Sequence, residues 1–221
     1  MKHKARLLER LPVVQAQFPG HRWLFLTLTV RNCRVDELRE SIRALVDGFR
    51  RLRESKQFPA VGWIRTIEVT RGRDGSAHPH IHCLLLVKPS YFRKHYISAA
   101  SWVQLWRRCC KLDYDPIVDV RAVKPNPRRS TDRLESVVAE IAKYSSKPAD
   151  LLADDAWLRV YADQVHRLRF MDSGGCLRGI LADDYDDLIN VDEEAGPEAD
   201  ESGDVDLRFG WDRPAGHYRK K

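Results

Sequence analysis

The pattern of apolar and polar positions along the chain predicts both strands and helices. Segments in which bulky apolar residues alternate or cluster, as they do in strands, are residues 23–30, 61–70, 78–87 and 116–125. Residues 71–77, RGRDGSA, consist mostly of turn formers. The second and third segments are therefore expected to form a β-hairpin around this turn.

Apolar residues also recur at helical spacing between these segments. The first predicted helix follows Asp36, its expected N-cap, and its apolar face consists of Leu38, Ile42, Leu45, Val46, Phe49 and Leu52. Further helices are expected over residues 98–112, from Asp132 through Ile141, and over 149–170, whereas the glycine-rich residues 173–181 are expected to form a closing turn. This order predicts an α+β domain with an antiparallel sheet flanked by helices.

Charge is distributed unevenly along the 221 residues. The net charge is +6, yet residues 183–206 hold 12 acidic residues and no Lys or Arg. Because residues 207–221 carry +4, residues 1–182 carry +14. A basic body of this kind favours a polyanionic partner such as nucleic acid, and a solvated basic surface is the alternative interpretation.

Composition excludes several classes of protein. The five cysteines are odd in number and include no CxxC pair, which argues against a disulfide framework or a four-cysteine zinc ribbon. No apolar run approaches the roughly 20 residues of a membrane span, and no secretory signal follows the basic N-terminus. We therefore expect a cytoplasmic protein with no membrane partner.

Three histidines occupy alternate positions in HPHIHCLLLV, residues 78–87. Residues two apart on a strand face the same side, so His80 and His82 point together, and His78 joins them if the strand has already begun. If the hairpin turn centres near Asp74, Glu68 lies opposite His80. A carboxylate inside the apolar run IEV is costly without a partner, and a divalent ion bound with these histidines is one such partner. A polar sheet edge whose histidines bond to water and backbone is the alternative.

A second cluster of polar residues lies in EIAKYSSKP, residues 140–148. Glu140, Tyr144 and Lys147 share one face if this segment is helical. A tyrosine near a metal can attack a phosphodiester, a lysine can stabilise the developing charge, and a glutamate can act as a general base. The alternative interpretation is a solvated helix surface without a catalytic role, because it would place Glu, Tyr and Lys at the same spacing.

Together these segments resemble the HUH endonuclease superfamily, and specifically the rolling-circle replication initiators (Rep proteins) of small bacterial plasmids. Residues 25–29 (FLTLT) are similar to the first motif of that family, HPHIH ending at His82 to the second, and 144–147 (YSSK) to the third. EVT at 68–70, SYFRKHYI ending at Ile97 and DYDPIVDVRAV at 113–123 also look like this group. The resemblance covers roughly residues 23–181.

The resemblance implies a five-stranded antiparallel sheet of the ferredoxin-like palm type with a metal site on its face, in which His80 and His82 form the metal-binding pair. With Glu68 of the hairpin as the third ligand, we expect this site to bind Mg²⁺ or Mn²⁺. The resemblance leaves the role of His78 open. It also implies that Tyr144 nicks a plasmid origin, forming a 5′-phosphotyrosine and freeing a 3′-hydroxyl, and that Glu140 acts at termination. The expected organisation is a basic segment 1–22, a nicking–joining domain 23–182 and an acidic, disordered tail 183–221.

The expected partner is single-stranded or cruciform DNA at a plasmid double-strand origin, together with a host helicase. Candidate phosphate contacts in turn-like segments beside the motifs are Arg71, Arg73, Arg128 and Arg129. Two alternatives stay open at this point. One is a single-tyrosine transposase or relaxase with the same chemistry, and the other is a non-catalytic module that binds single-stranded nucleic acid by aromatic stacking.

Overall fold

The computed structural model describes residues 2–123, 154–181, 209–212 and 217–220 of the chain. It divides into two units, Met1–Ala182 and Asp183–Lys221. Within the second unit, strands β6 (Phe209–Asp212) and β7 (His217–Lys220) pair antiparallel. The candidate metal ligands lie in the first unit.

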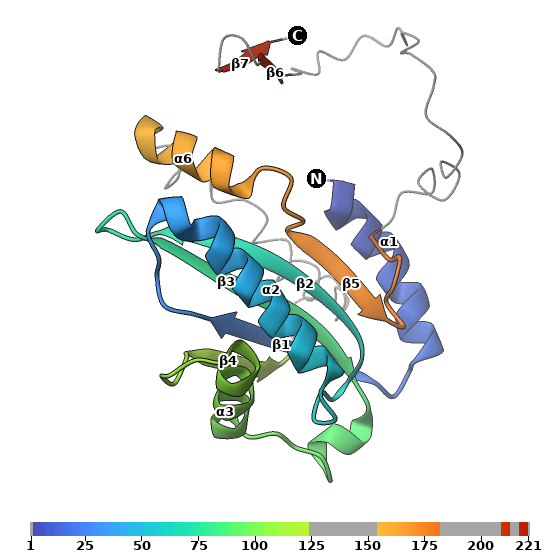
Figure 1. Ribbon diagram of the computed structural model, residues 1–221. Coiled ribbons are helices and arrows are strands. Elements are labelled where there is room, and N and C mark those ends of the chain that lie inside the picture. Colours follow the sequence, from blue (N-terminus) through green and yellow to red (C-terminus); the bar gives the residue numbers. More distant parts are fainter. Residues whose placement is uncertain (1, 124–153, 182–208, 213–216, 221) are drawn as a thin grey trace, which may run out of the picture. The chain divides into compact units, whose positions relative to one another are not determined.

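The described residues of the first unit form one five-stranded sheet, and Figure 1 shows how the helices lie around it. Its strands are β1 (Arg22–Thr29), β2 (Ala60–Arg71), β3 (Ala77–Val87), β4 (Val118–Ala122) and β5 (Met171–Gly175). The described helices are α1 (Lys2–Gln17), α2 (Leu38–Glu54), α3 (Ala99–Cys110) and α6 (Asp155–Val165), with 3₁₀ turns η1 (Val35–Glu37) and η2 (Pro89–Phe92). Within the described residues, no helix is long and apolar enough to cross a membrane.

The sheet is antiparallel throughout, with the strand order β4-β1-β3-β2-β5. Helix α2 connects β1 to β2, and α3 lies between β3 and β4. The first four strands thus have the arrangement of a ferredoxin-like sheet, to which β5 is added beside β2. The predicted α+β class and five-stranded antiparallel sheet are confirmed.

Helices and turns cover both faces of the sheet, which explains why β3 is almost continuously apolar. Ile81, Cys83 and Leu85 pack in the cluster that includes the buried faces of α2 and α3. Leu84 and Leu86 point the other way, into a cluster with α1 and the turn after β5. Because side chains alternate along a strand, the even-numbered histidines of β3 belong to this second face.

Helix α1 was not expected from the sequence, which suggested only a basic segment there. Leu7 and Leu11 are fully buried against β1 and β3, and the Trp23 indole donates a hydrogen bond to Gln15 at 2.8 Å. Pro12 lies inside the helix and obscured its pattern in the sequence.

Of two further expectations about the elements, one was wrong and one was partly confirmed. Asp36 is not the N-cap of α2: it lies in η1 and forms an ion pair with Arg34 at 2.8 Å. Residues 176–181 form the predicted turn, but residues 173–175 belong to the edge strand β5, in which Gly174 packs directly against the Trp63 ring, where a Cβ would be 2.5 Å away. The helix expected from Asp132 lies outside the described residues.

Candidate metal centre

The β2–β3 hairpin sets the register of the candidate ligands. Arg71 pairs with Ala77, so the turn centres on Asp74, and Glu68 pairs directly with His80. The Asp74 carboxylate fixes this turn by accepting hydrogen bonds from the amide and the hydroxyl of Ser76. The predicted register is therefore confirmed.

Glu68, His80 and His82 converge on one another from the two strands. The Oε2 atom of Glu68 lies 3.1 Å from Nε2 of His80 and 3.0 Å from Nε2 of His82. One ligand atom from each residue lies within 4.8 Å of the other two, and all three side chains are buried. The arrangement is compact enough for the three side chains to share one metal ion.

Hydrogen bonds to their Nδ1 atoms orient both histidines. Nδ1 of His80 lies 3.2 Å from the His78 carbonyl, and Nδ1 of His82 lies 3.1 Å from the Thr27 hydroxyl. A carbonyl only accepts, so the contact with His78 requires a proton on Nδ1 of His80, and a metal ion bound at Nε2 would take the place of the hydrogen bond from Nε2 to Glu68. Such outer contacts are typical of metal-binding histidines, where they fix the tautomer and the ring orientation.

The chemistry of these three donors fits a cation. Oε1 of Glu68 is buried and has no hydrogen-bond partner among the described residues. Burial raises the pKa of the Glu68 carboxyl, but hydrogen bonds from His80 and His82 outweigh it and lower that pKa to about 2. A charged carboxylate therefore faces two imidazole nitrogens at neutral pH, and a divalent ion between them would satisfy all three groups.

The FLTLT segment in β1 supplies contacts that sequence reasoning did not assign. Thr27 pairs with His82 across the strands, and the Phe25 ring stacks on the His82 ring with centroids 5.6 Å apart. Arg121, on β4, pairs with Phe25 across the two strands, and its guanidinium lies 4.9 Å from the centre of the Phe25 ring. The sequence offered the same kind of signal for both residues. Thr27 carries a hydroxyl within an apolar strand, as Glu68 carries a carboxylate within one.

His78 lies outside the group of three. Its Nδ1 is 2.7 Å from the side-chain oxygen of Asn32, in the loop after β1. Its ring centre is 5.0 Å from that of His80. Burial and the neighbouring His80 lower the pKa of His78, although Glu68 acts in the opposite direction. The histidine is thus tied to the loop beside the centre.

The two arginines of the hairpin differ in their surroundings. Arg71 forms an ion pair with Asp154 at 2.7 Å, and its guanidinium lies 5.6 Å from the centre of the Trp157 ring. Arg73 is exposed in the turn. Arg71 therefore joins the hairpin to the start of α6. The remaining predicted site residues, Glu140, Tyr144, Lys147, Arg128 and Arg129, lie outside the described residues.

Comparison with known proteins identifies the family of the chain. The Replication protein family matches residues 1–219, nearly the whole sequence. The chain belongs to this family. The predicted resemblance to Rep proteins is thereby confirmed. No solved structure matches the chain.

Curated relatives are similar over most of their length. A "Replication protein" of Staphylococcus aureus is 36% identical over 231 residues, covering 96% of this chain and 97% of the relative. A "Protein rep" of Lactiplantibacillus plantarum is 37% identical over 211 residues, covering 88% of this chain and 67% of the relative. The similarity therefore extends well beyond the hairpin and its histidines.

Proposed function

We propose that this protein is a metal-dependent DNA nicking–joining enzyme that initiates rolling-circle replication of a plasmid. Membership of the Replication protein family supports a role in replication initiation over that of a transposase or relaxase. The observation that carries the proposed chemistry is the buried Glu68 carboxylate, which faces two histidines tethered through Nδ1. Such a group is costly to bury unless a cation shares the site.

The proposed cofactor is Mg²⁺ or Mn²⁺, held by Glu68, His80 and His82. When bound, a divalent ion supplies Lewis acidity at a phosphodiester. The protein itself holds the donors in place, because the Thr27 hydroxyl and the His78 carbonyl orient the two rings. Three protein donors leave coordination positions free for a substrate oxygen.

Tyr144 is the proposed nucleophile. Its hydroxyl loses a proton, its oxygen forms a bond to the phosphorus, and the bond from phosphorus to the 3′ oxygen breaks. The products are a 5′-phosphotyrosine and a strand ending in a 3′-hydroxyl, which can prime synthesis. Reversal rejoins the strand without ATP, because one phosphoester replaces another.

Two further residues complete the proposed mechanism. Lys147, three positions after the tyrosine, stabilises negative charge on the phenolate or the phosphate. Glu140, four positions before it, acts as a general base on a water or a terminal hydroxyl and so ends the cycle. The role of Lys147 rests on the similarity of residues 144–147 to the third family motif, and that of Glu140 on its position one turn of the expected helix before the tyrosine.

The proposed substrate is single-stranded or cruciform DNA at a plasmid double-strand origin in the cytoplasm, opened with a host helicase. Arg73, Arg128 and Arg129 are proposed phosphate contacts that position the strand without reading its sequence. Arg71 is proposed to contribute mainly through its ion pair with Asp154.

A covalent adduct tests the proposal directly. The full-length protein is incubated with Mn²⁺ and a library of single-stranded oligonucleotides, and Tyr144 is examined for bound DNA by denaturing gel and mass spectrometry. We expect an adduct that disappears with EDTA, with Tyr144→Phe and with His80→Ala/His82→Ala. His166→Ala, which removes an exposed histidine elsewhere, is the matched control and should leave the adduct unchanged.

Failure of this experiment has a clear meaning. Tight strand binding without an adduct on any oligonucleotide would favour a non-catalytic module that binds single strands. An adduct that survives EDTA would mean that the tyrosine reacts without the metal ion. An adduct on a residue other than Tyr144 would overturn the assignment of the nucleophile.

A further inference from the structure

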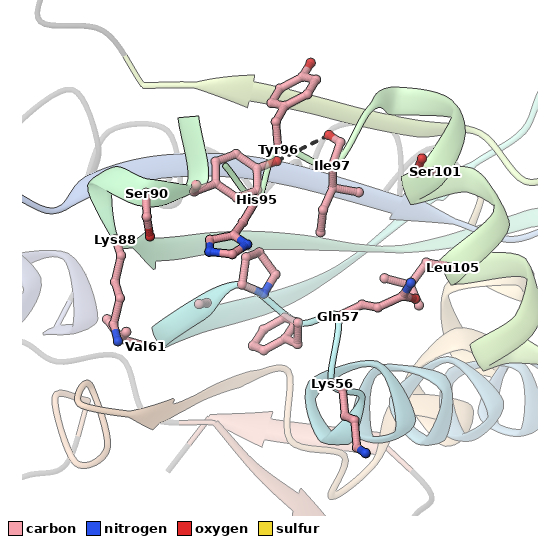
Figure 2. Close-up of a pocket in the computed structure, with 14 residues that line it drawn as sticks. Lys56, Gln57, Val61, Lys88, Ser90, His95, Tyr96, Ile97, Ser101 and Leu105 are labelled. Carbon is pink, nitrogen blue, oxygen red and sulfur yellow. Dashed lines mark hydrogen bonds between the residues drawn. The ribbon is translucent and has the colours of Figure 1, made fainter. Parts of the chain in front are cut away.

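A second concave site lies at the end of the β2–β3 pair opposite the hairpin turn. Its volume is about 690 Å³, within the range of pockets that hold small organic ligands. Its walls come from the segment before β2, the segment after β3 and the first half of α3 (Figure 2). It shares no residue with the candidate metal centre.

Basic residues line this pocket and acidic residues do not. The basic residues are Lys56, Lys88 and His95. Neither lysine forms an ion pair with any described residue, whereas arginines elsewhere in the unit, such as Arg34 and Arg107, lie against aspartates. The pocket therefore presents cationic groups that an anionic ligand can reach.

Aromatic rings also border the pocket. Figure 2 shows the His95 ring among the lining side chains, while the Tyr96 ring projects outward from the rim, away from the two lysines. Tyr96 is 66% exposed, which is unusual for a large aromatic side chain. Behind it, the Tyr91 hydroxyl accepts a hydrogen bond from the Trp102 indole at 3.3 Å, so this wall is fixed to α3.

We propose that this pocket binds single-stranded DNA, with the lysines contacting phosphates and the Tyr96 ring stacking on an unpaired base. Basic grooves with accessible aromatic rings are the usual means of binding single strands. The inference rests on the proposed function, because it assigns the pocket to the same DNA substrate. It adds a binding subsite that is separate from the cleavage chemistry.

The pocket lies apart from the candidate metal centre. Val61, in the pocket, and Glu68 are seven positions apart on β2. At about 3.3 Å per residue this is roughly 23 Å along the strand. The pocket therefore contributes affinity without taking part in the reaction.

The charge contacts are tested with the full-length protein in EDTA, where no cleavage occurs. The probe is a fluorescein-labelled dT15 oligonucleotide, and binding is followed by anisotropy over a range of salt concentrations. Lys56→Gln/Lys88→Gln should reduce the salt slope of log K by about 1.4, since each phosphate contact on a single strand contributes about 0.7. Arg93→Gln/Lys94→Gln is the matched control, because both residues are exposed in the same segment and neither lines the pocket.

Stacking is tested separately. Tyr96→Ala should weaken dT15 binding roughly ten-fold, and Tyr96→Phe should bind like the wild type, because stacking on one base depends on the ring. Unchanged affinity of Tyr96→Ala overturns the stacking contact. Equal weakening of a 15-base-pair duplex by Tyr96→Ala overturns the single-strand assignment.

The two proposals fail in different ways. If Lys56→Gln/Lys88→Gln leaves the salt slope unchanged, or if the control pair reduces it equally, the pocket inference is overturned even where the Tyr144 adduct forms. If no adduct forms on any oligonucleotide but the lysine and tyrosine variants still weaken dT15 binding, the pocket stands and the nicking proposal falls.

Discussion

The Thr27 hydroxyl lies 3.1 Å from Nδ1 of His82, on the side of the ring opposite the atom that faces Glu68. The two residues are paired across β1 and β3, so the contact is set by the sheet and not by a loop. It ties the first sequence motif to a proposed metal ligand of the second. Thr27, which is not one of the proposed metal ligands, thus holds the His82 ring in place.

Replacing Thr27 with valine should weaken metal binding without abolishing it. The methyl group keeps the volume but removes the contact to His82, and losses of such outer contacts typically reduce metal affinity about 10–100-fold. Titration calorimetry with Mn²⁺ measures the change, and Thr27→Ser should restore affinity. Thr29→Val is the matched control, since Thr29 also pairs with a histidine across β1 and β3 but its hydroxyl donates a hydrogen bond to the Ile117 carbonyl. Equal losses in both valine variants would contradict the orienting role.

Metal should stabilise the folded protein but should not be required for folding. At a Mn²⁺ concentration about 100 times its Kd, the free energy of unfolding should rise by about 2.7 kcal/mol. Glu68→Gln should abolish this rise, because the carboxylate contacts both histidines. Thermal unfolding with Mn²⁺ or EDTA tests both statements. A metal-free protein that is already unfolded would point to a structural metal site instead.

Stability and metal binding should both depend on pH. The pKa of Glu68 is lowered from 4.5 to about 2 in the fold, so its ionised form contributes stability above about pH 4.5 that is lost as the pH falls toward 2. Metal affinity should fall on acidification for a separate reason, because protons and the metal ion compete for the same ligand atoms. Urea unfolding of the metal-free wild type and Glu68→Gln between pH 6 and 2 should show a steeper loss in the wild type. Parallel curves would contradict the lowered pKa.

The two hairpin arginines should behave in opposite ways. Arg71→Gln breaks the ion pair with Asp154 and should reduce stability by up to about 1 kcal/mol, while leaving the salt dependence of DNA binding nearly unchanged. Arg73→Gln should leave stability unchanged and reduce the salt slope on a single strand by about 0.7. Urea unfolding and anisotropy titrations measure the two effects. A reduced salt slope in Arg71→Gln would contradict this and would indicate that Arg71 contacts a phosphate.

Local periodicity was enough to predict the hairpin part of the site. The strand period of two, together with a turn centred on Asp74, is sufficient to place Glu68 opposite His80. The contribution of Thr27 depends on pairing between strands that are 55 positions apart along the chain, which periodicity does not specify. Strand β5 could not be predicted because Gly174 is required by the Trp63 ring, a contact that exists only after the sheet has formed.

The central position of β3 has a consequence for its amide hydrogens. With β1 on one side and β2 on the other, its backbone is hydrogen-bonded along both edges and covered on both faces. Amides in such a strand exchange with solvent mainly when the whole unit opens. The backbone that carries His80 and His82 would therefore stay assembled through the local openings that occur in the folded protein. A metal ion could leave and return many times within the lifetime of a single folded molecule.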